Sequence, residues 1–121
     1  MIFSRDEGED QAHATLELNG EIDMAVAPAL RQLEEHLPLR ELQRLTIDMG
    51  AVRFMDSTGI GFLVSLRKRM LPEAELAVVN ASPPIARVVQ ITGLESFLGL
   101  VVDPAPRTRS LPDSDSLDRT G

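Results

Sequence analysis

The sequence of 121 residues predicts an α/β fold, in which a mixed, mostly parallel β-sheet carries helices packed on it. Short apolar segments typical of strands alternate along the chain with amphipathic segments of helical period. Strand–helix–strand units of this kind place their strands parallel through right-handed crossovers. One early segment alternates apolar and polar residues, which is typical of a strand with one face in water and makes the sheet mixed.

That alternating strand covers residues 12–19, and we expect it to end at Gly20. Residues 2–5 are expected to form a short partner strand ahead of it. A helix is predicted to follow, capped by Asp23 and running to about Leu37, with Pro28 tolerated because it falls in the first turn. The expected inner face of this helix holds Val26, Leu30, Leu33 and Leu37, and the outer face holds Arg31, Gln32, Glu34 and Glu35.

The second half of the chain continues the alternation. Residues 45–49 are expected to form a strand, and residues 52–55 lead into a helix with Ile60, Leu63, Leu66 and Met70 on one face. The continuously apolar residues 76–79 suit a parallel strand covered on both faces. A helix is predicted from Ser82 to a left-handed Gly93, and residues 97–102 complete the last strand.

Composition favours one globular domain, since 43% of the residues are hydrophobic. We expect this domain to span residues 1–103 and a disordered tail rich in Pro, Ser and Asp to span residues 104–121. The chain has no cysteine, which excludes disulfides and thiolate metal sites. It shows neither a signal-peptide apolar region nor a run near the roughly 18 apolar residues of a membrane helix. We therefore expect a soluble, cytoplasmic protein with no membrane contact.

The net charge of −7 argues against direct nucleic-acid binding, which needs a basic surface. Residues 1–50 hold 4 basic and 11 acidic side chains, whereas residues 51–121 hold 8 of each. The acidity thus belongs to the first half of the chain. It would steer a partner with a basic face toward that half, or serve only as ordinary solubilising charge.

Two hydroxyls and two glycines stand where residues 52–55 meet the central helix. Ser57 or Thr58 is placed to cap this helix, and Gly61, Ser65 and Lys68 fall on a face away from the apolar one. A hydroxyl at that end is also well placed to carry a phosphate, because helix amides and the dipole favour negative charge. The alternative is a plain N-cap with small residues for close packing.

This junction resembles a known family signature. The run Asp56-Ser57-Thr58-Gly59-Ile60-Gly61 is similar to the D-S-[ST]-G-[ILV]-G signature of STAS domains, specifically of bacterial anti-sigma factor antagonists. Gly20-Glu21-Ile22-Asp23 resembles the G-E-[LIV]-D that ends an early strand in that family. The resemblance covers about residues 16–103 and implies the STAS fold. It departs at the tail, where the family commonly packs a further helix on the sheet.

The resemblance implies a partner-switching regulator. In the unphosphorylated form such a protein binds an anti-sigma factor that is also a serine kinase and releases the sigma factor. The kinase phosphorylates the family serine, matched by Ser57, and a serine phosphatase restores the active form. We expect the partner-binding surface to hold Asp23, Asp56, Ser57, Thr58, Gly59, Gly61 and Ser65. Asp23 either helps to orient the kinase or acts only as a helix cap. We expect a monomer when the protein is free.

Other functions remain open or are set aside. One alternative is a STAS subunit that docks on a transport ATPase or signalling complex without phosphorylation. Another is nucleotide or small-ligand binding at the same loop. The histidines, His13 and His36, lack a second ligand at metal spacing, so we expect no metal or cofactor. Nucleotide-binding glycine motifs and the G-x-S-x-G elbow are missing, and nothing supports catalysis.

Overall fold

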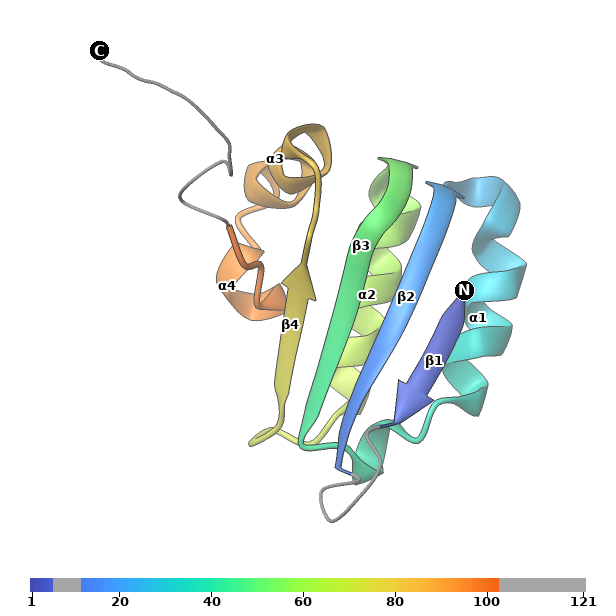
Figure 1. The fold of residues 1–121 in the computed structure, drawn as a ribbon, viewed down its shortest axis with the longest axis vertical. Helices are drawn as coiled ribbons and strands as arrows, with labels where there is room; N and C mark the ends of the chain where they lie inside the picture. The colour runs from blue at the N-terminus through green and yellow to red at the C-terminus, as the bar shows by residue number, and fades with distance from the viewer. Residues whose placement is uncertain (6–11, 103–121) are drawn as a thin grey trace.

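A computed structural model describes residues 1–5 and 12–102. Its sheet has the strand order β1-β2-β3-β4 (Figure 1). Strand β1 (Ile2–Arg5) pairs antiparallel with β2 (His13–Ile22), whereas β2 pairs parallel with β3 (Arg44–Met55) and β3 parallel with β4 (Glu75–Val79). The prediction of a mixed, mostly parallel sheet with an early partner strand is confirmed.

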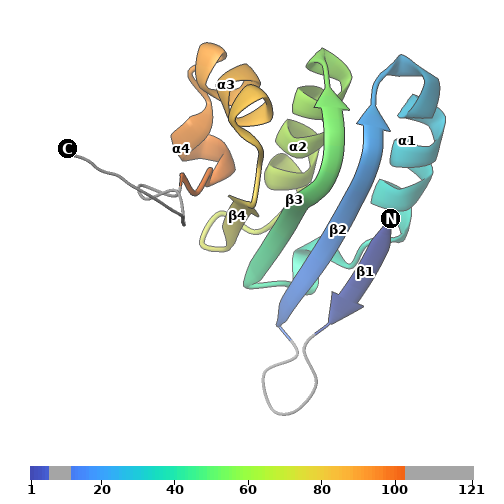
Figure 2. The same ribbon diagram turned by 45° about the horizontal axis from the view of Figure 1, so that its top comes forward.

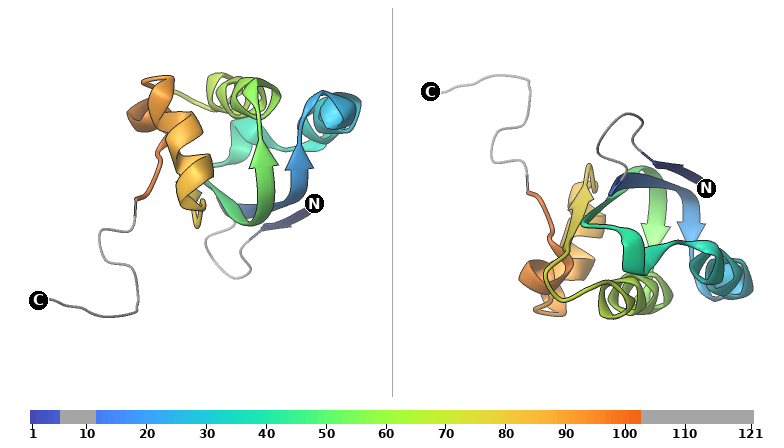
Figure 3. Two further views of the ribbon diagram at one scale, coloured as in Figure 1. Left: turned by 90° about the horizontal axis from the view of Figure 1, so that it is seen from above. Right: turned by 90° about the horizontal axis from the view of Figure 1, so that it is seen from below.

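Among residues 1–5 and 12–102, four helices connect or follow the strands. These are α1 (Ala27–His36), α2 (Ser57–Arg69), α3 (Pro83–Ile91) and the short α4 (Glu95–Leu98), with 3-10 turns η1 (Met24–Val26) and η2 (Leu39–Glu41). Helices α1 and α2 lie side by side on one face of the sheet, whereas α3 and α4 stand at its β4 edge (Figures 2 and 3). Because α1 and α2 both begin at the same end of the sheet, their first turns are neighbours.

The hydrophobic core lies between the sheet and these helices. Inward side chains such as Leu16, Ile47 and Val78 are fully buried, as are Leu63 and Leu66 of α2. The opposite face carries mostly polar side chains, and no helix among the described residues covers it (Figure 3). In the described part of the chain, helices therefore cover β4 on one face only, and not on both faces as expected. Its outward residues Ala77 and Val79 stay only half-buried.

Strands β2 and β3 are longer than the sequence pattern predicts. Strand β2 does not end at Gly20 but passes through it with φ at +78° and continues to Ile22, with irregular register against β3. Strand β3 runs unbroken from Arg44 to Met55. Its pairing with β2 continues on both sides of the turn-like residues Asp48 and Gly50, so the strand does not end there. Both extensions bring the strand ends to the start of α2.

The last strand predicted over residues 97–102 is also wrong. Helix α4 occupies Glu95–Leu98, and only a single bridge joins Leu100 to Val78. Gly99 ends α4 in the left-handed conformation with φ at +67°, and a side chain there would overlap the Leu76 carbonyl. Helix α4 and the turn at Gly99 therefore occupy the apolar residues that the sequence pattern assigned to a strand. Gly93 takes the predicted left-handed conformation after α3.

The expectations about the C-terminal tail, membrane helices and metal sites can be compared with the described residues only. The tail predicted over residues 104–121, and with it the domain boundary at residue 103, falls outside them. Within residues 1–5 and 12–102, no helix is long and apolar enough to cross a membrane. In the same ranges, His, Asp and Glu side chains form no group of three or more that is suited to hold a metal ion.

Candidate functional site

The two sequence motifs meet at one end of the sheet. The backbone amide of Asp56 donates to the carbonyl oxygen of Ile22 over 3.2 Å, which ties the end of β3 to the end of β2. Asp23 and Ser57 follow these two residues directly. Parallel pairing thus brings together two motifs that stand more than 30 residues apart in the sequence.

The cap of α2 is Asp56, which corrects the expectation that Ser57 or Thr58 serves as the cap. Oδ1 of Asp56 accepts a hydrogen bond from the amide of Thr58 at 2.8 Å, and its backbone is extended as an N-cap requires. The Asp56 carbonyl also accepts from the amides of Gly59 and Ile60. Aspartate performs this role well because its carboxylate also complements the helix dipole.

With Asp56 as the cap, Ser57 becomes the first residue of α2 and is exposed. Its hydroxyl makes no hydrogen bond to any residue in the described part of the chain. Asp23, half-buried across from it, caps the 3-10 turn η1 by accepting from the amide of Ala25 at 3.0 Å. Asp23 is therefore a cap, but of η1 and not of the helix that we predicted to run to about Leu37, because the N-cap of α1 is Val26.

The two glycines of the motif have different surroundings. Gly59 is buried, and a Cβ at this position would overlap the side chain of Met55 and crowd Ile22. Gly59 therefore lets α2 lie close to the strand ends. Gly61 is exposed, and a Cβ there would meet nothing within 4 Å. The helix surface at Gly61 is bare backbone that another molecule can approach closely.

A groove of about 210 Å³ runs between α1 and α2, beside the start of α2. Helix α1 lines it with Ala27, Leu30, Arg31 and Glu34, and helix α2 lines it with Thr58, Gly61, Phe62 and Ser65. The groove therefore contains three of the predicted partner-binding residues. Thr58 and Ser65 are half-buried in its wall.

The prediction that Glu34 lies on the outer face of α1 is wrong, because Glu34 lines this groove. It is only 8% exposed, the one buried charged residue in the described part of the chain. Oε2 of Glu34 accepts a hydrogen bond from the Ser65 hydroxyl at 2.5 Å and pairs with Nη1 of Arg69 at 3.1 Å. One signal in the sequence points to this burial: Glu34 stands four residues after Leu30, on the apolar stripe of α1.

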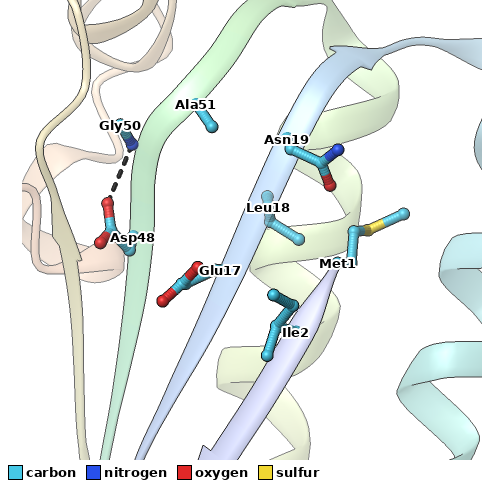
Figure 4. A pocket seen from close by; sticks show the side chains of 8 residues that line it. All are labelled: Met1, Ile2, Glu17, Leu18, Asn19, Asp48, Gly50 and Ala51. Carbon is cyan, nitrogen blue, oxygen red and sulfur yellow. Dashed lines mark hydrogen bonds between the residues drawn. The ribbon is translucent and has the colours of Figure 1, made fainter.

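Two other hollows contain none of the predicted site residues. One, of about 300 Å³, lies on the uncovered sheet face around Met1, Glu17 and Asn19 (Figure 4). Asp48 on its border is already engaged, since Oδ1 accepts from the amide of Gly50 at 2.9 Å. The other lies at the far end of the sheet, near the Arg44–Glu75 ion pair. Neither adjoins the start of α2.

Residues 7–107 match the model of the STAS domain family. The anti-sigma-B factor antagonist of Listeria monocytogenes is 36% identical over 93 residues, which cover 74% of this chain and 79% of the relative. That of Bacillus subtilis is 33% identical over 102 residues, 83% and 92% of the two chains. The crystal structure of an anti-sigma factor antagonist from Mycobacterium paratuberculosis superposes with a TM-score of 0.69 at 28% identity, over 85% of this chain and 88% of that one.

Proposed function

The chain belongs to the STAS domain family, and we propose that it is an anti-sigma factor antagonist switched by phosphorylation of Ser57. The unphosphorylated form binds an anti-sigma factor that is also a serine kinase, and this binding releases the sigma factor. The kinase then phosphorylates Ser57 and the complex dissociates. A serine phosphatase restores the binding form. The protein acts in the cytoplasm, as a monomer when free, and catalyses no reaction itself.

The observation that carries this proposal is the state of the Ser57 hydroxyl. It is exposed at the first position of α2 and makes no hydrogen bond to a described residue. A kinase can therefore reach it without unfolding the helix. Thr58 is a poorer acceptor, because it is half-buried in the groove wall and its β-branched side chain is stiff.

Phosphorylation acts through charge in this proposal. A phosphoryl group adds about −1.5 to −2 charges at neutral pH. The three helix amides that follow Ser57 are already used, since Asp56 accepts from the amides of Thr58, Gly59 and Ile60. The new charge therefore adds to that of the neighbouring Asp56 carboxylate at the surface. A partner that holds nucleotide phosphates is repelled, while the fold changes little.

The partner-binding surface in this proposal surrounds Ser57. Asp23, Asp56 and Thr58 stand beside it, and Gly61 and Ser65 continue the surface along the α1–α2 groove. Gly59 was assigned to the same surface from the sequence. Because it is buried, it supports the surface from beneath through its contact with Met55.

The test is phosphorylation by the anti-sigma factor kinase with ATP, followed by peptide mass spectrometry. We expect one phosphate, and we expect it on Ser57 both in the unmodified chain and in Thr58→Ala. In a pull-down, Ser57→Ala should bind the kinase constitutively and Ser57→Asp should bind poorly, although one carboxylate only partly imitates phosphate. Phosphate on another serine, or equal binding by both variants, would refute the switch and favour a docking subunit that is not phosphorylated. Calorimetry with nucleotides tests the small-ligand alternative.

A further inference from the structure

Glu34 has an incomplete set of partners. Both of its contacts, to the Ser65 hydroxyl and to Arg69, use the single oxygen Oε2. Oε1 has no hydrogen-bond partner among the described residues. A buried carboxylate normally has its acceptor positions filled, because an unsatisfied buried polar atom costs free energy. Oε1 is therefore open to a further hydrogen-bond donor that none of the contacts in the described structure supplies.

The missing group has to come through the α1–α2 groove, because Glu34 lines it. The groove has apolar walls formed by Leu30 and Phe62 and a bare floor at Gly61, where no side chain obstructs entry. It lies directly beside Thr58 and hence beside Ser57. A molecule docked over Ser57 therefore covers this groove as well.

We propose that the groove receives an arginine side chain of the anti-sigma factor, whose guanidinium pairs with Oε1 of Glu34. This inference rests on the proposed function. Arginine fits because its planar guanidinium pairs with carboxylates, is weakly hydrated and tolerates contact with aromatic and apolar walls. Arg69, whose side chain is half exposed, already pairs with Oε2, so Oε1 is the oxygen that is open to a second guanidinium.

Arg31 on the groove wall allows a further test of the proposed arginine docking. Its side chain is exposed and makes no ion pair with any described residue. It stands three residues before Glu34, within reach on the same helix. A guanidinium there repels an incoming arginine and competes for the same carboxylate. Removal of Arg31 should therefore strengthen docking, whereas a purely structural role for Glu34 predicts no such gain.

The first experiment measures the affinity of the full-length, unphosphorylated chain for the anti-sigma factor kinase by calorimetry. Glu34→Gln keeps the shape but removes the charge, and we expect its affinity to fall at least about tenfold. The matched control is Glu35→Gln, an exposed neighbour with the same charge change, which should stay within about twofold. Arg31→Gln should bind more tightly than the unmodified chain. Circular dichroism checks that each variant is folded.

The second experiment does not depend on the kinase. N-acetylarginine methylamide is titrated into the ¹⁵N-labelled chain, with the uncharged citrulline analogue as the control. We expect saturable shifts of the Gly61 and Ser65 amide resonances with the arginine derivative alone, and their loss in Glu34→Gln. Equal kinase binding by Glu34→Gln and the unmodified chain, or equal responses to both derivatives, would overturn the inference. A third outcome is that the arginine derivative shifts the groove resonances but neither the unmodified chain nor any variant binds the kinase. That outcome would refute the proposed function and not the groove.

Discussion

The amide of Asp56 donates to the carbonyl of Ile22 over 3.2 Å, and this bond joins the ends of two parallel strands. Its consequence is that the residues which follow, Asp23 and Ser57, belong to one surface. Each strand end is closed by an aspartate that caps the next turn, Asp23 for η1 and Asp56 for α2. The region around Ser57 is therefore built by main-chain pairing before any partner contributes.

The cap at Asp56 should be measurable as stability. Asp56→Ala removes the acceptor of the Thr58 amide, and we expect a loss of about 1 kcal/mol in the free energy of unfolding. Asp56→Asn keeps an oxygen in place and should retain most of that free energy. Urea unfolding followed by circular dichroism provides the measurement. Equal stability of the alanine variant and the unmodified chain would show that the cap contributes nothing.

The two glycines of the motif should respond oppositely to alanine. Gly59→Ala places a methyl group against Met55 and should cost about 1–3 kcal/mol through overpacking. Gly61→Ala meets open space and should stabilise the helix by up to about 1 kcal/mol. Thermal and urea unfolding measure the free energy of unfolding of both variants, so the same substitution is compared at two positions of one helix. A stabilised Gly59→Ala would contradict the packing role of that glycine.

A large residue at Gly61 should block partner binding without unfolding the chain. Gly61→Arg extends a long side chain over the α1–α2 groove, and we expect it to abolish binding of the anti-sigma factor kinase. Gly61→Ala adds only a methyl group at the same position and should weaken binding less than Gly61→Arg does. A pull-down measures binding, and circular dichroism measures folding. Unfolding of the arginine variant would show that Gly61 is needed for core packing.

Stability in acid should depend on the ion pair at the far end of the sheet. Arg44 lowers the pKa of Glu75 below its ordinary value of 4.5, first by hydrogen bonding, at 2.8 and 3.3 Å, and then by its charge. A carboxylate whose pKa is lower in the folded state stabilises the fold above its unfolded pKa. This contribution is lost as the pH falls through the lower, folded value.

Glu75→Gln should therefore lower the melting temperature slightly at pH 7 and leave it unchanged at pH 3. The effect is small because Glu75 is exposed and its charge is screened by solvent. The control is Glu73→Gln, which changes an exposed neighbour that makes no ion pair with any described residue, and its melting temperature at pH 7 should equal that of the unmodified chain. A deficit of Glu75→Gln that persists at pH 3 would point to a cause other than this ion pair.

Local patterns in the sequence were sufficient for most of the fold. The alternation over β2 and the apolar face of α2 predict their elements, because a half-buried strand and an amphipathic helix each impose a period on their residues. Those patterns were misleading at β4, whose apolar run does not tell one covered face from two. They also failed at α4, where the left-handed Gly99 and its close approach to Leu76 decide the chain path.

The sequence by itself determined which family the chain resembles, where its hydroxyl and glycines stand, and which end of α2 carries them. Only the tertiary structure decided that Asp56 is the cap and that the Ser57 hydroxyl has no hydrogen-bond partner among the described residues. It also decided that Gly59 packs against Met55 while Gly61 stays open. It alone placed Glu34 against Ser65 and Arg69. The physical reason is that these roles depend on contacts between segments distant in the sequence. A residue's spacing along its own helix does not specify what the neighbouring helix places opposite it.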